Sequence, residues 1–379
     1  MGTTAVIVVA AAVAQRPARP GHAWVFLQYL LGFKRLGREV LLLDRVPPES
    51  GSAETAAMVQ WLESVMDWAG LNGAWAVALP DGSYAGLTRA EVKRRLEESE
   101  LLLDVNGVLN GDEILGLASN RVFLDIDPGF VQIWKALGLA DVFSGHDKFV
   151  TVASRIGRPD CSIPTLDLHW STIRPPVVLE FWPPVRPNRS GAFTSVATWR
   201  GPFGPLEYGG MRHGLRVHEF RRFLPLPGAS AARFELVLDI DPADIRDRSA
   251  LEGSGWHVHD PASTVVDLTT YRSYIAQSKA EFCVAKSMYV QTRSGWFSDR
   301  SACYLATGRP VLAQETGFSE TLPTGMGLVS FDSMDAAIAG VHTIEGDLVM
   351  HSRAARRIAE EYFDSDIVLT GLLTQVGRR

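Results

Sequence analysis

Short apolar runs alternate with amphipathic segments along the first half of the chain. Continuous apolar runs are typical of strands buried on both faces of a sheet. Such strands are predicted at Ala5–Val13, Glu39–Leu43, Trp75–Ala78, Leu101–Val105, Val122–Asp125 and Phe149–Val152. Helices are predicted at Val25–Leu36, Thr55–Trp68, Arg89–Glu98 and Phe130–Leu137. This alternation predicts a parallel sheet covered by helices on both faces.

Five prolines between positions 175 and 187 interrupt this pattern, and a second alternating series follows. Its strands are predicted at Thr194–Ala197, Phe234–Ile240, Trp256–Val258, Ala280–Ala285 and Gly327–Ser330. Its helices are predicted at Leu215–Phe223, Tyr271–Gln277, within Arg293–Val311, and at Ser352–Tyr362 and Ile367–Val376. We therefore predict an α/β fold with two Rossmann-like domains that face a cleft. The expected divisions are an N-terminal domain (1–175), a linker (176–192), a C-terminal domain (193–350) and C-terminal helices (351–379) that pack back across the linker.

Length and composition narrow the class of protein. A chain of 379 residues fits two domains, and its net charge of −6 lacks the basic surplus of a nucleic-acid-binding protein. Three widely spaced cysteines argue against a disulfide framework and a zinc site, and favour a reducing cytoplasm. The apolar run Ala5–Ala14 lacks the basic flank of a signal peptide, and no other run approaches the ~20 residues that cross a bilayer. We expect a cytoplasmic protein without stable membrane insertion.

The segment Arg293–Val311 (RSGWFSDRSACYLATGRPV) joins a glycine turn, a short apolar helix and the start of a strand. A glycine turn before a helix leaves several backbone N–H groups unpaired, with the positive end of the helix dipole behind them. Such a turn suits a phosphate or diphosphate, and Arg293 and Arg300 lie beside it. The chain contains no HExxH, P-loop or GxGxxG motif, so a zinc protease, a P-loop enzyme and the common NAD fingerprint are unsupported.

His22 lies in the turn Pro20-Gly21-His22, between the first predicted strand and its helix. Ligands of open parallel sheets bind outside the carboxyl ends of the strands, so this turn faces the predicted cleft. A hydroxyl is a poor nucleophile, and an imidazole that titrates near neutral pH can take its proton. We predict that His22 is a general base; the alternative is a histidine that caps the helix start or hydrogen-bonds locally.

Residues 21–44 (GHAWVFLQYLLGFKRLGREVLLLD) resemble the opening of the UDP-glycosyltransferase group, a GT-B family. In that group a glycine-histidine turn starts the first helix, and a Gly-x-Glu-Val phrase leads into the second strand. Residues 293–317 resemble the group's donor-nucleotide segment. The resemblance implies that His22 deprotonates an acceptor hydroxyl and that Asp104 holds the other ring nitrogen, with Asp127 as the alternative partner.

The donor side follows from the same resemblance. Plant members of the group have histidine-cysteine-glycine-tryptophan where this chain has Arg293-Ser294-Gly295-Trp296, so Arg293 replaces the histidine that meets the phosphate. A guanidinium can bond two phosphate oxygens at once. Asp299 as a helix cap and Arg300 as a solvated charge are the alternatives. Donor contacts are expected at Trp199, Arg200, Val266, Arg293, Ser294, Gly295, Trp296, Asp299, Arg300, Ser301 and Glu315.

The acceptor side is less defined. Asp127 and His146 are expected to line the acceptor pocket, with a structural role favoured for His146, and the loops Asn72–Leu87 and Asp141–Asp167 are expected to shape it. Asp125-Ile126-Asp127 has the spelling of the metal motif of GT-A enzymes, which have a different, single-domain fold. The GT-B resemblance implies no metal and no cofactor, with a UDP- or dTDP-sugar as substrate.

The sequence thus predicts a glycosyltransferase that moves a sugar from a nucleotide sugar to a hydroxyl of a small molecule, such as a natural product. Attack on the anomeric carbon by an acceptor activated by His22 predicts inversion of configuration. One alternative is a GT-B-fold sugar-nucleotide epimerase, which needs carboxylates around the donor sugar. The other is a non-catalytic protein that binds a nucleotide sugar. Neither nucleic acid nor a membrane is an expected partner.

Overall fold

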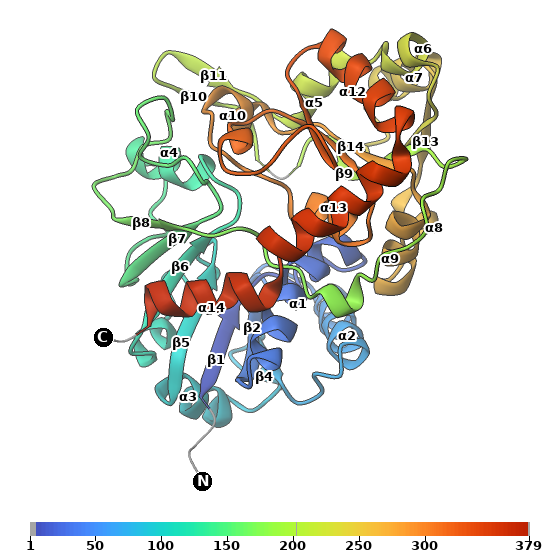
Figure 1. Cartoon of the computed structure of the whole chain (residues 1–379). Helices are drawn as coiled ribbons and strands as arrows, with labels where there is room; N and C mark the ends of the chain where they lie inside the picture. The colour runs from blue at the N-terminus through green and yellow to red at the C-terminus, as the bar shows by residue number, and fades with distance from the viewer. Residues whose placement is uncertain (1–4, 202, 378–379) are drawn as a thin grey trace.

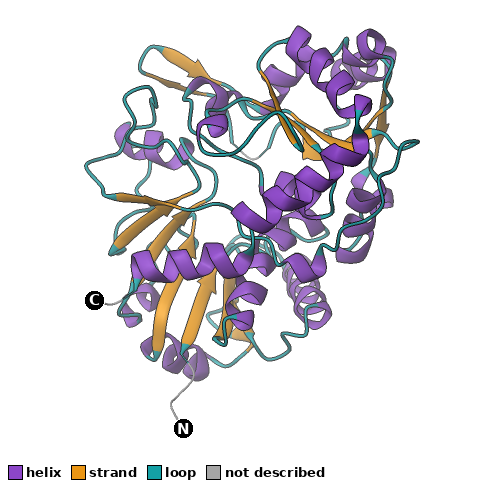
Figure 2. Cartoon of the chain, viewed as in Figure 1, coloured by secondary structure: helices purple, strands orange, loops and turns teal. Residues whose placement is uncertain are grey.

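The computed structural model describes residues 5–201 and 203–377 and contains two separate sheets, each packed against helices (Figures 1 and 2). Residues 1–4 of the predicted N-terminal domain lie outside the described residues. The same is true of Pro202, and of residues 378–379 after the last predicted helix. No helix of the described chain is both long enough and apolar enough to span a bilayer. The predicted two-sheet α/β fold is confirmed.

The first sheet has the strand order β4-β3-β2-β1-β5-β6-β7-β8, and every neighbouring pair is parallel except β3–β4. Its strands are β1 (Val6–Ala10), β2 (Glu39–Arg45), β3 (Trp75–Ala78), β4 (Tyr84–Gly86), β5 (Ser99–Val105), β6 (Arg121–Asp125), β7 (Lys148–Thr151) and β8 (Trp170–Thr172). Its helices are α1 (Pro20–Arg35), α2 (Ser52–Trp68), α3 (Arg89–Glu97), the 3₁₀ turn η1 (Glu113–Leu117) and α4 (Phe130–Ala136).

The central strand β1 shows why the sequence pattern works. All five of its residues are buried, and alternation sends Ile7 and Val9 to one apolar cluster and Val8 to another on the opposite face. A strand covered on both faces reads as one apolar run without polar alternation. This burial explains why the strand positions of the first domain were predictable.

The second sheet is entirely parallel, with the order β13-β12-β9-β14-β15-β16. Its strands are β9 (Phe193–Thr198), β12 (Phe234–Asp239), β13 (Trp256–His259), β14 (Ala280–Cys283), β15 (Val311–Gln314) and β16 (Leu328–Phe331). The helical elements of this half are α5 (Arg216–Phe220), η3 (Arg221–Phe223), α6 (Leu226–Ser230), α7 (Ile245–Gly253), α8 (Pro261–Thr264), α9 (Leu268–Gln277), α10 (Ser287–Gln291), α11 (Asp299–Ala306), η4 (Phe318–Glu320) and α12 (Met334–Gly346).

The chain crosses between the two halves twice. The proline-rich linker, which contains η2 (Leu179–Phe181), crosses first, and the C-terminal helices α13 (Leu348–Tyr362) and α14 (Ser365–Val376) return (Figure 1). The two crossings are bonded to each other, because the Val177 amide donates to the Phe363 carbonyl at 2.7 Å and the Ser365 amide donates to the Val177 carbonyl at 2.9 Å. Helix α14 then packs on α1, where the missing side chain of Gly32 leaves room for Leu369 and Ser365.

Several elements differ from the sequence-based prediction. The hairpin of β10 (Leu206–Tyr208) and β11 (Met211–His213) lies between two predicted elements, where no strand was expected. The helix predicted at Leu215–Phe223 is divided into α5 and a 3₁₀ turn. The short strands β4 and β8 were missed because three residues carry too little pattern, and α7 was missed because its residues are mostly polar.

Candidate active site

A cavity of about 710 Å³ separates the two sheets at the carboxyl ends of their strands. Ala12, Asn106 and Asp127 line it from just beyond β1, β5 and β6, while Thr198 and Asp239 end β9 and β12 on the other side. Ligands of parallel sheets bind beyond the carboxyl ends of the strands, and here two such edges face each other. The cavity is therefore a cleft between two ligand-binding edges.

His22 lines this cleft from the third position of α1. Its Nε2 lies 2.8 Å from the carbonyl oxygen of Ala12, and a carbonyl only accepts, so Nε2 carries the proton and Nδ1 holds a free lone pair. Burial, with a smaller contribution from the charges of Arg16 and Arg19, lowers the pKa of His22 to about 4, although the hydrogen bond to Ala12 opposes this shift. The ring is therefore a neutral acceptor at neutral pH.

Three arginines give the cleft a positive region. Arg16 and Arg19 lie in the loop after β1, and Arg19 forms a 2.9 Å ion pair with Asp239 of the opposite domain. Arg216, at the start of α5, donates to the carbonyls of Val284 and Thr198, and it forms no ion pair with any residue that the structure describes. Burial, and next Arg300, lower the Arg216 pKa to about 10, so its guanidinium stays charged at neutral pH. A half-buried guanidinium without an ion-pair partner is available to bind an anion.

The start of α11 forms the floor of the cleft through Ser298, Asp299 and Arg300. Arg300 forms a buried ion pair with Glu281 (2.6 Å) and donates a hydrogen bond to the Val196 carbonyl. Asp299 faces the cleft, and burial raises its pKa. Trp296 also lines the cleft and stacks on Tyr289 with ring centroids 4.4 Å apart.

Solved glycosyltransferases share this arrangement of two sheets. An α-glucosyltransferase, solved with UDP and a 13-mer DNA containing an A:G mismatch, aligns over 99% of this chain and 100% of its own, with 10% identity and a TM-score of 0.63. HepE from Anabaena, solved with UDP-glucose, aligns over 98% of both chains with 11% identity and a TM-score of 0.58. AviGT4, a glycosyltransferase involved in avilamycin A biosynthesis, aligns over 98% of this chain and 97% of its own, with 13% identity and a TM-score of 0.56.

The chain has the GT-B fold. No family model matches the chain, and no curated protein sequence matches it. The structural neighbours do not single out the UDP-glycosyltransferase group within the GT-B fold, so the resemblance to that group stays a prediction.

The glycine turn does not offer a free phosphate cradle in this GT-B cleft. The Gly295 amide donates to the Thr316 carbonyl at 2.7 Å, and the Trp296 amide donates to Ser294 Oγ at 3.2 Å. Arg293 extends to the surface, where it pairs with Asp160 and Glu320. These contacts correct the prediction that Arg293, Ser294 and Gly295 grip a diphosphate, because their donors already have partners.

The turn is instead an interdomain contact, and Gly295 is its closest point. A Cβ at Gly295 would lie 2.2 Å from Ser154 Oγ, and the residue has φ +73°. Gly295→Ala is expected to cost about 1–3 kcal/mol of stability and to lower the melting temperature measured by calorimetry. Gly253→Ala is the control, because nothing lies within 4 Å of its Cβ position and its helix favours alanine. Equal melting temperatures for the two variants would contradict this contact.

The predicted partner of His22 is wrong. Asp104 is fully buried, and its Oδ2 lies 3.0 Å from Nε2 of His146, whose other nitrogen contacts the Phe143 carbonyl. The Asp104 carboxylate also accepts from the Leu109 amide. Asp104 and His146 therefore form a structural pair beneath the loops, and a backbone carbonyl orients His22 in place of a carboxylate.

Three donor predictions in the C-terminal domain are also corrected. Trp199 is 1% exposed and donates from Nε1 to Asp247 at 2.8 Å inside the core. Arg200 is bound to Asp244 on the surface. Val266 is exposed and is not among the residues that line the cleft, whereas its neighbour Val265 is. A cleft residue and a surface residue are here direct neighbours in the sequence, and the sequence pattern does not show which of the two faces the cleft.

Two further donor predictions fall on residues with local roles. Glu315 Oε1 accepts from the amides of Thr316 and Gly317, so it stabilises its own turn. Ser301 is fully buried within α11. Of the fifteen residues predicted for the site, those that line the cleft are His22, Asp127, Trp296, Asp299 and Arg300, and their roles stay predictions.

Sequence reasoning missed Arg16, Arg19 and Arg216. The first two lie in the loop between β1 and the helix that contains the predicted base, so their place after a buried strand was an available signal. Arg216 follows the hairpin β10–β11, which separates it from β9 in the sequence. Its position near the end of β9 could therefore not be predicted from chain order. Asp127 was found, but its carboxylate binds Lys286 across the cleft at 2.6 Å and accepts from Tyr289.

Proposed function

We propose that this protein is a metal-independent glycosyltransferase that moves a sugar from a nucleoside diphosphate to a hydroxyl of a small acceptor, with inversion. One observation carries the proposal: a neutral histidine of the N-terminal domain and an unpaired arginine of the C-terminal domain line the same GT-B cleft. Glycosyl transfer needs a base at the acceptor and positive charge at the leaving group. His22 and Arg216 supply these two functions.

His22 acts at the acceptor. The acceptor oxygen attacks the anomeric carbon while its proton moves to Nδ1 of His22, and the bond from that carbon to the diphosphate breaks. The electron pair of this bond stays on the diphosphate oxygen. The Ala12 carbonyl keeps the other ring nitrogen protonated, so Nδ1 is held ready as the acceptor. In-line displacement of this kind inverts the configuration.

The diphosphate leaves with growing negative charge. Arg216 provides a guanidinium within the C-terminal domain, and Arg16 lies across from it in the loop after β1. Fixed positive groups aimed at developing charge lower the barrier, because they need no reorganisation during the step. A bound diphosphate also opposes the effect of the arginines on His22, which raises the pKa of His22 toward a value better suited to a base.

The alternatives receive less support from the cleft. An epimerase needs free carboxylates around the donor sugar. Of the carboxylates that line the cleft, Asp127 is paired with Lys286 and Asp239 with Arg19, which leaves Asp299 alone. UDP is the nucleotide seen with HepE and with the α-glucosyltransferase, which favours a UDP-sugar as the donor here. The link of AviGT4 to avilamycin A favours a natural-product acceptor.

Turnover with defined donors tests the proposal. The full chain is incubated with UDP- and dTDP-sugars and a panel of phenolic and glycosidic acceptors, and nucleotide release is measured together with product mass. Release that depends on the acceptor, with a product of inverted anomeric configuration by NMR, is expected. Binding of neither nucleotide in calorimetry would overturn the proposal, and an epimerised sugar formed without acceptor would replace it.

A further inference from the structure

A second cavity of about 710 Å³ lies in the N-terminal domain beside the cleft. It opens above the carboxyl ends of β2 and β3, between the β3–β4 loop and the segment that carries η1. Gln15 lines both this cavity and the cleft, and its amide donates to the buried Asp44 at 3.0 Å. The two cavities are therefore neighbours that share the side chain of Gln15.

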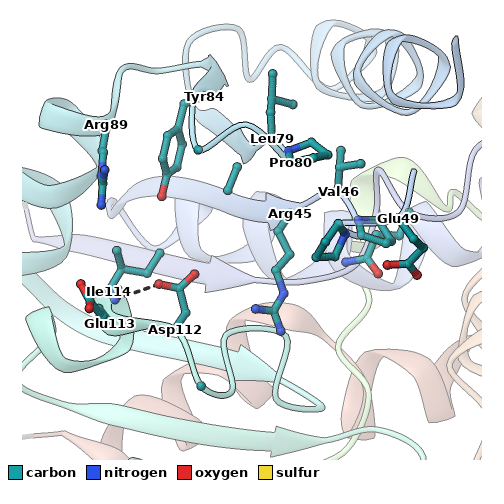
Figure 3. Close-up of a pocket in the computed structure, with 16 residues that line it drawn as sticks. Arg45, Val46, Glu49, Leu79, Pro80, Tyr84, Arg89, Asp112, Glu113 and Ile114 are labelled. Carbon is teal, nitrogen blue, oxygen red and sulfur yellow. Dashed lines mark hydrogen bonds between the residues drawn. The ribbon is translucent and has the colours of Figure 1, made fainter. Parts of the chain in front are cut away.

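The walls of this cavity carry charges of both signs (Figure 3). Arg45 and Arg89 face Glu49, Asp112 and Glu113 across it, so the carboxylates outnumber the guanidinium groups. Within the described part of the chain, neither arginine forms an ion pair, and the guanidinium of Arg45 makes only a 3.5 Å contact with the Asn110 carbonyl. A phosphate or carboxylate ligand would meet three negative groups, so the cavity does not suit an anion.

The remaining surface is apolar. Leu79, Pro80 and Pro47 present C–H groups, and Tyr84 extends its ring into the same space (Figure 3). Burial, followed by the charge of Asp112, raises the pKa of Tyr84, so its hydroxyl stays a hydrogen-bond donor. Separate donors and acceptors around an apolar surface match a ring that carries hydroxyl groups on its edge, because each hydroxyl both donates and accepts.

We propose that this second cavity binds a sugar ring of the acceptor, so that the acceptor is a glycoside or an oligosaccharide and not a bare aglycone. The hydroxyls of that ring accept from Arg45 and Arg89 and donate to the carboxylates. The word acceptor rests on the proposed function, but the binding of a neutral sugar ring by these residues does not.

Binding tests this inference without turnover. Saturation-transfer NMR and calorimetry are run on the full chain with UDP present, using p-nitrophenyl glycosides of glucose, galactose, mannose and xylose, and p-nitrophenol alone. At least one glycoside is expected to bind more tightly than p-nitrophenol. Arg45→Met and Arg89→Met are each expected to raise its dissociation constant about tenfold, because each removes a charged donor to a hydroxyl.

Two variants sharpen the result. Tyr84→Phe removes only a hydroxyl and is expected to weaken glycoside binding without altering p-nitrophenol binding. Arg94→Met is the matched control, since Arg94 lies on the same helix as Arg89 but pairs with Glu98 on the surface. Circular dichroism and melting curves verify that each variant is folded.

The outcomes separate the two proposals. If p-nitrophenol binds as tightly as every glycoside, if no glycoside binds, or if the folded Arg45 and Arg89 variants keep the parent affinity, the sugar-binding inference is wrong. Transfer to aglycones at equal efficiency would leave the proposed function intact and remove this inference. Glycoside binding without any nucleotide binding would support this inference and contradict the proposed function.

Discussion

His22→Ala is expected to lower kcat for glycosyl transfer by about 10²- to 10⁴-fold, the usual contribution of a positioned general base. The dissociation constant of UDP is expected to stay within about twofold of the parent value, because the variant removes no cation from the donor side. His257→Ala is the control, since His257 is exposed on β13 and lies away from the cleft. A His22→Ala protein with parent activity would remove the base from the mechanism.

The pH profile gives the same prediction a second readout. The pKa of His22 in the free protein is about 4, so the ring is the neutral base at every pH above that value and becomes protonated below it. The acid limb of kcat/KM is therefore expected near pH 4 instead of near 6.5, where an unperturbed histidine titrates. The acid limb of kcat is expected at higher pH, because it reports the complex with a bound diphosphate. An acid limb that persists in His22→Ala would assign it to another group.

Arg216→Met is expected to raise the dissociation constant of UDP by about 10- to 100-fold, as measured by calorimetry. Hydrogen bonds from a charged donor contribute about 1.5–3 kcal/mol, and each 1.4 kcal/mol is a factor of ten. Methionine keeps much of the length of the side chain and removes only the guanidinium. The fold is expected to tolerate the change, because Arg216 forms no ion pair within the described residues.

Arg200→Met provides the contrast, because Arg200 is an arginine of the same domain whose partners, Asp244 and Asp247, lie outside the cleft. Its UDP affinity is expected to match the parent protein. Arg293→Met is expected to behave in the same way, since Arg293 is bound to Asp160 and Glu320. Loss of UDP binding in Arg200→Met or Arg293→Met, with parent affinity in Arg216→Met, would reverse the assignment of the diphosphate contact.

Much of the fold followed from the sequence because both sheets are parallel apart from the edge strand β4. Strand β3 was predicted at its observed bounds, and β1, β2 and β5 at nearly the right places, because burial on both faces leaves continuous apolar runs. The hairpin β10–β11 was missed because its three-residue strands are partly exposed and follow a stretch rich in glycine and proline. Tertiary pairing, and not local pattern, makes those strands.

The candidate site was only partly predictable, and the reason is visible at its residues. His22 was found because its place after β1 depends on chain order alone. Whether the amide of Gly295 is free depends on Thr316, which is distant in sequence, and the sequence offered no sign of that bond. Trp199 was assigned to the cleft by its place directly after a strand, but side-chain direction at a strand end varies from one residue to the next.

The bonds that join Val177 to Phe363 and Ser365 tie the outgoing and returning chain into a single pivot. Two independent tethers would allow the halves to slide or twist, whereas one pivot leaves rotation about a shared axis as the softest motion. For a given rotation, the parts of the cleft farthest from Val177 are then displaced the most. We therefore expect the cleft to open and close mainly by rotation about Val177.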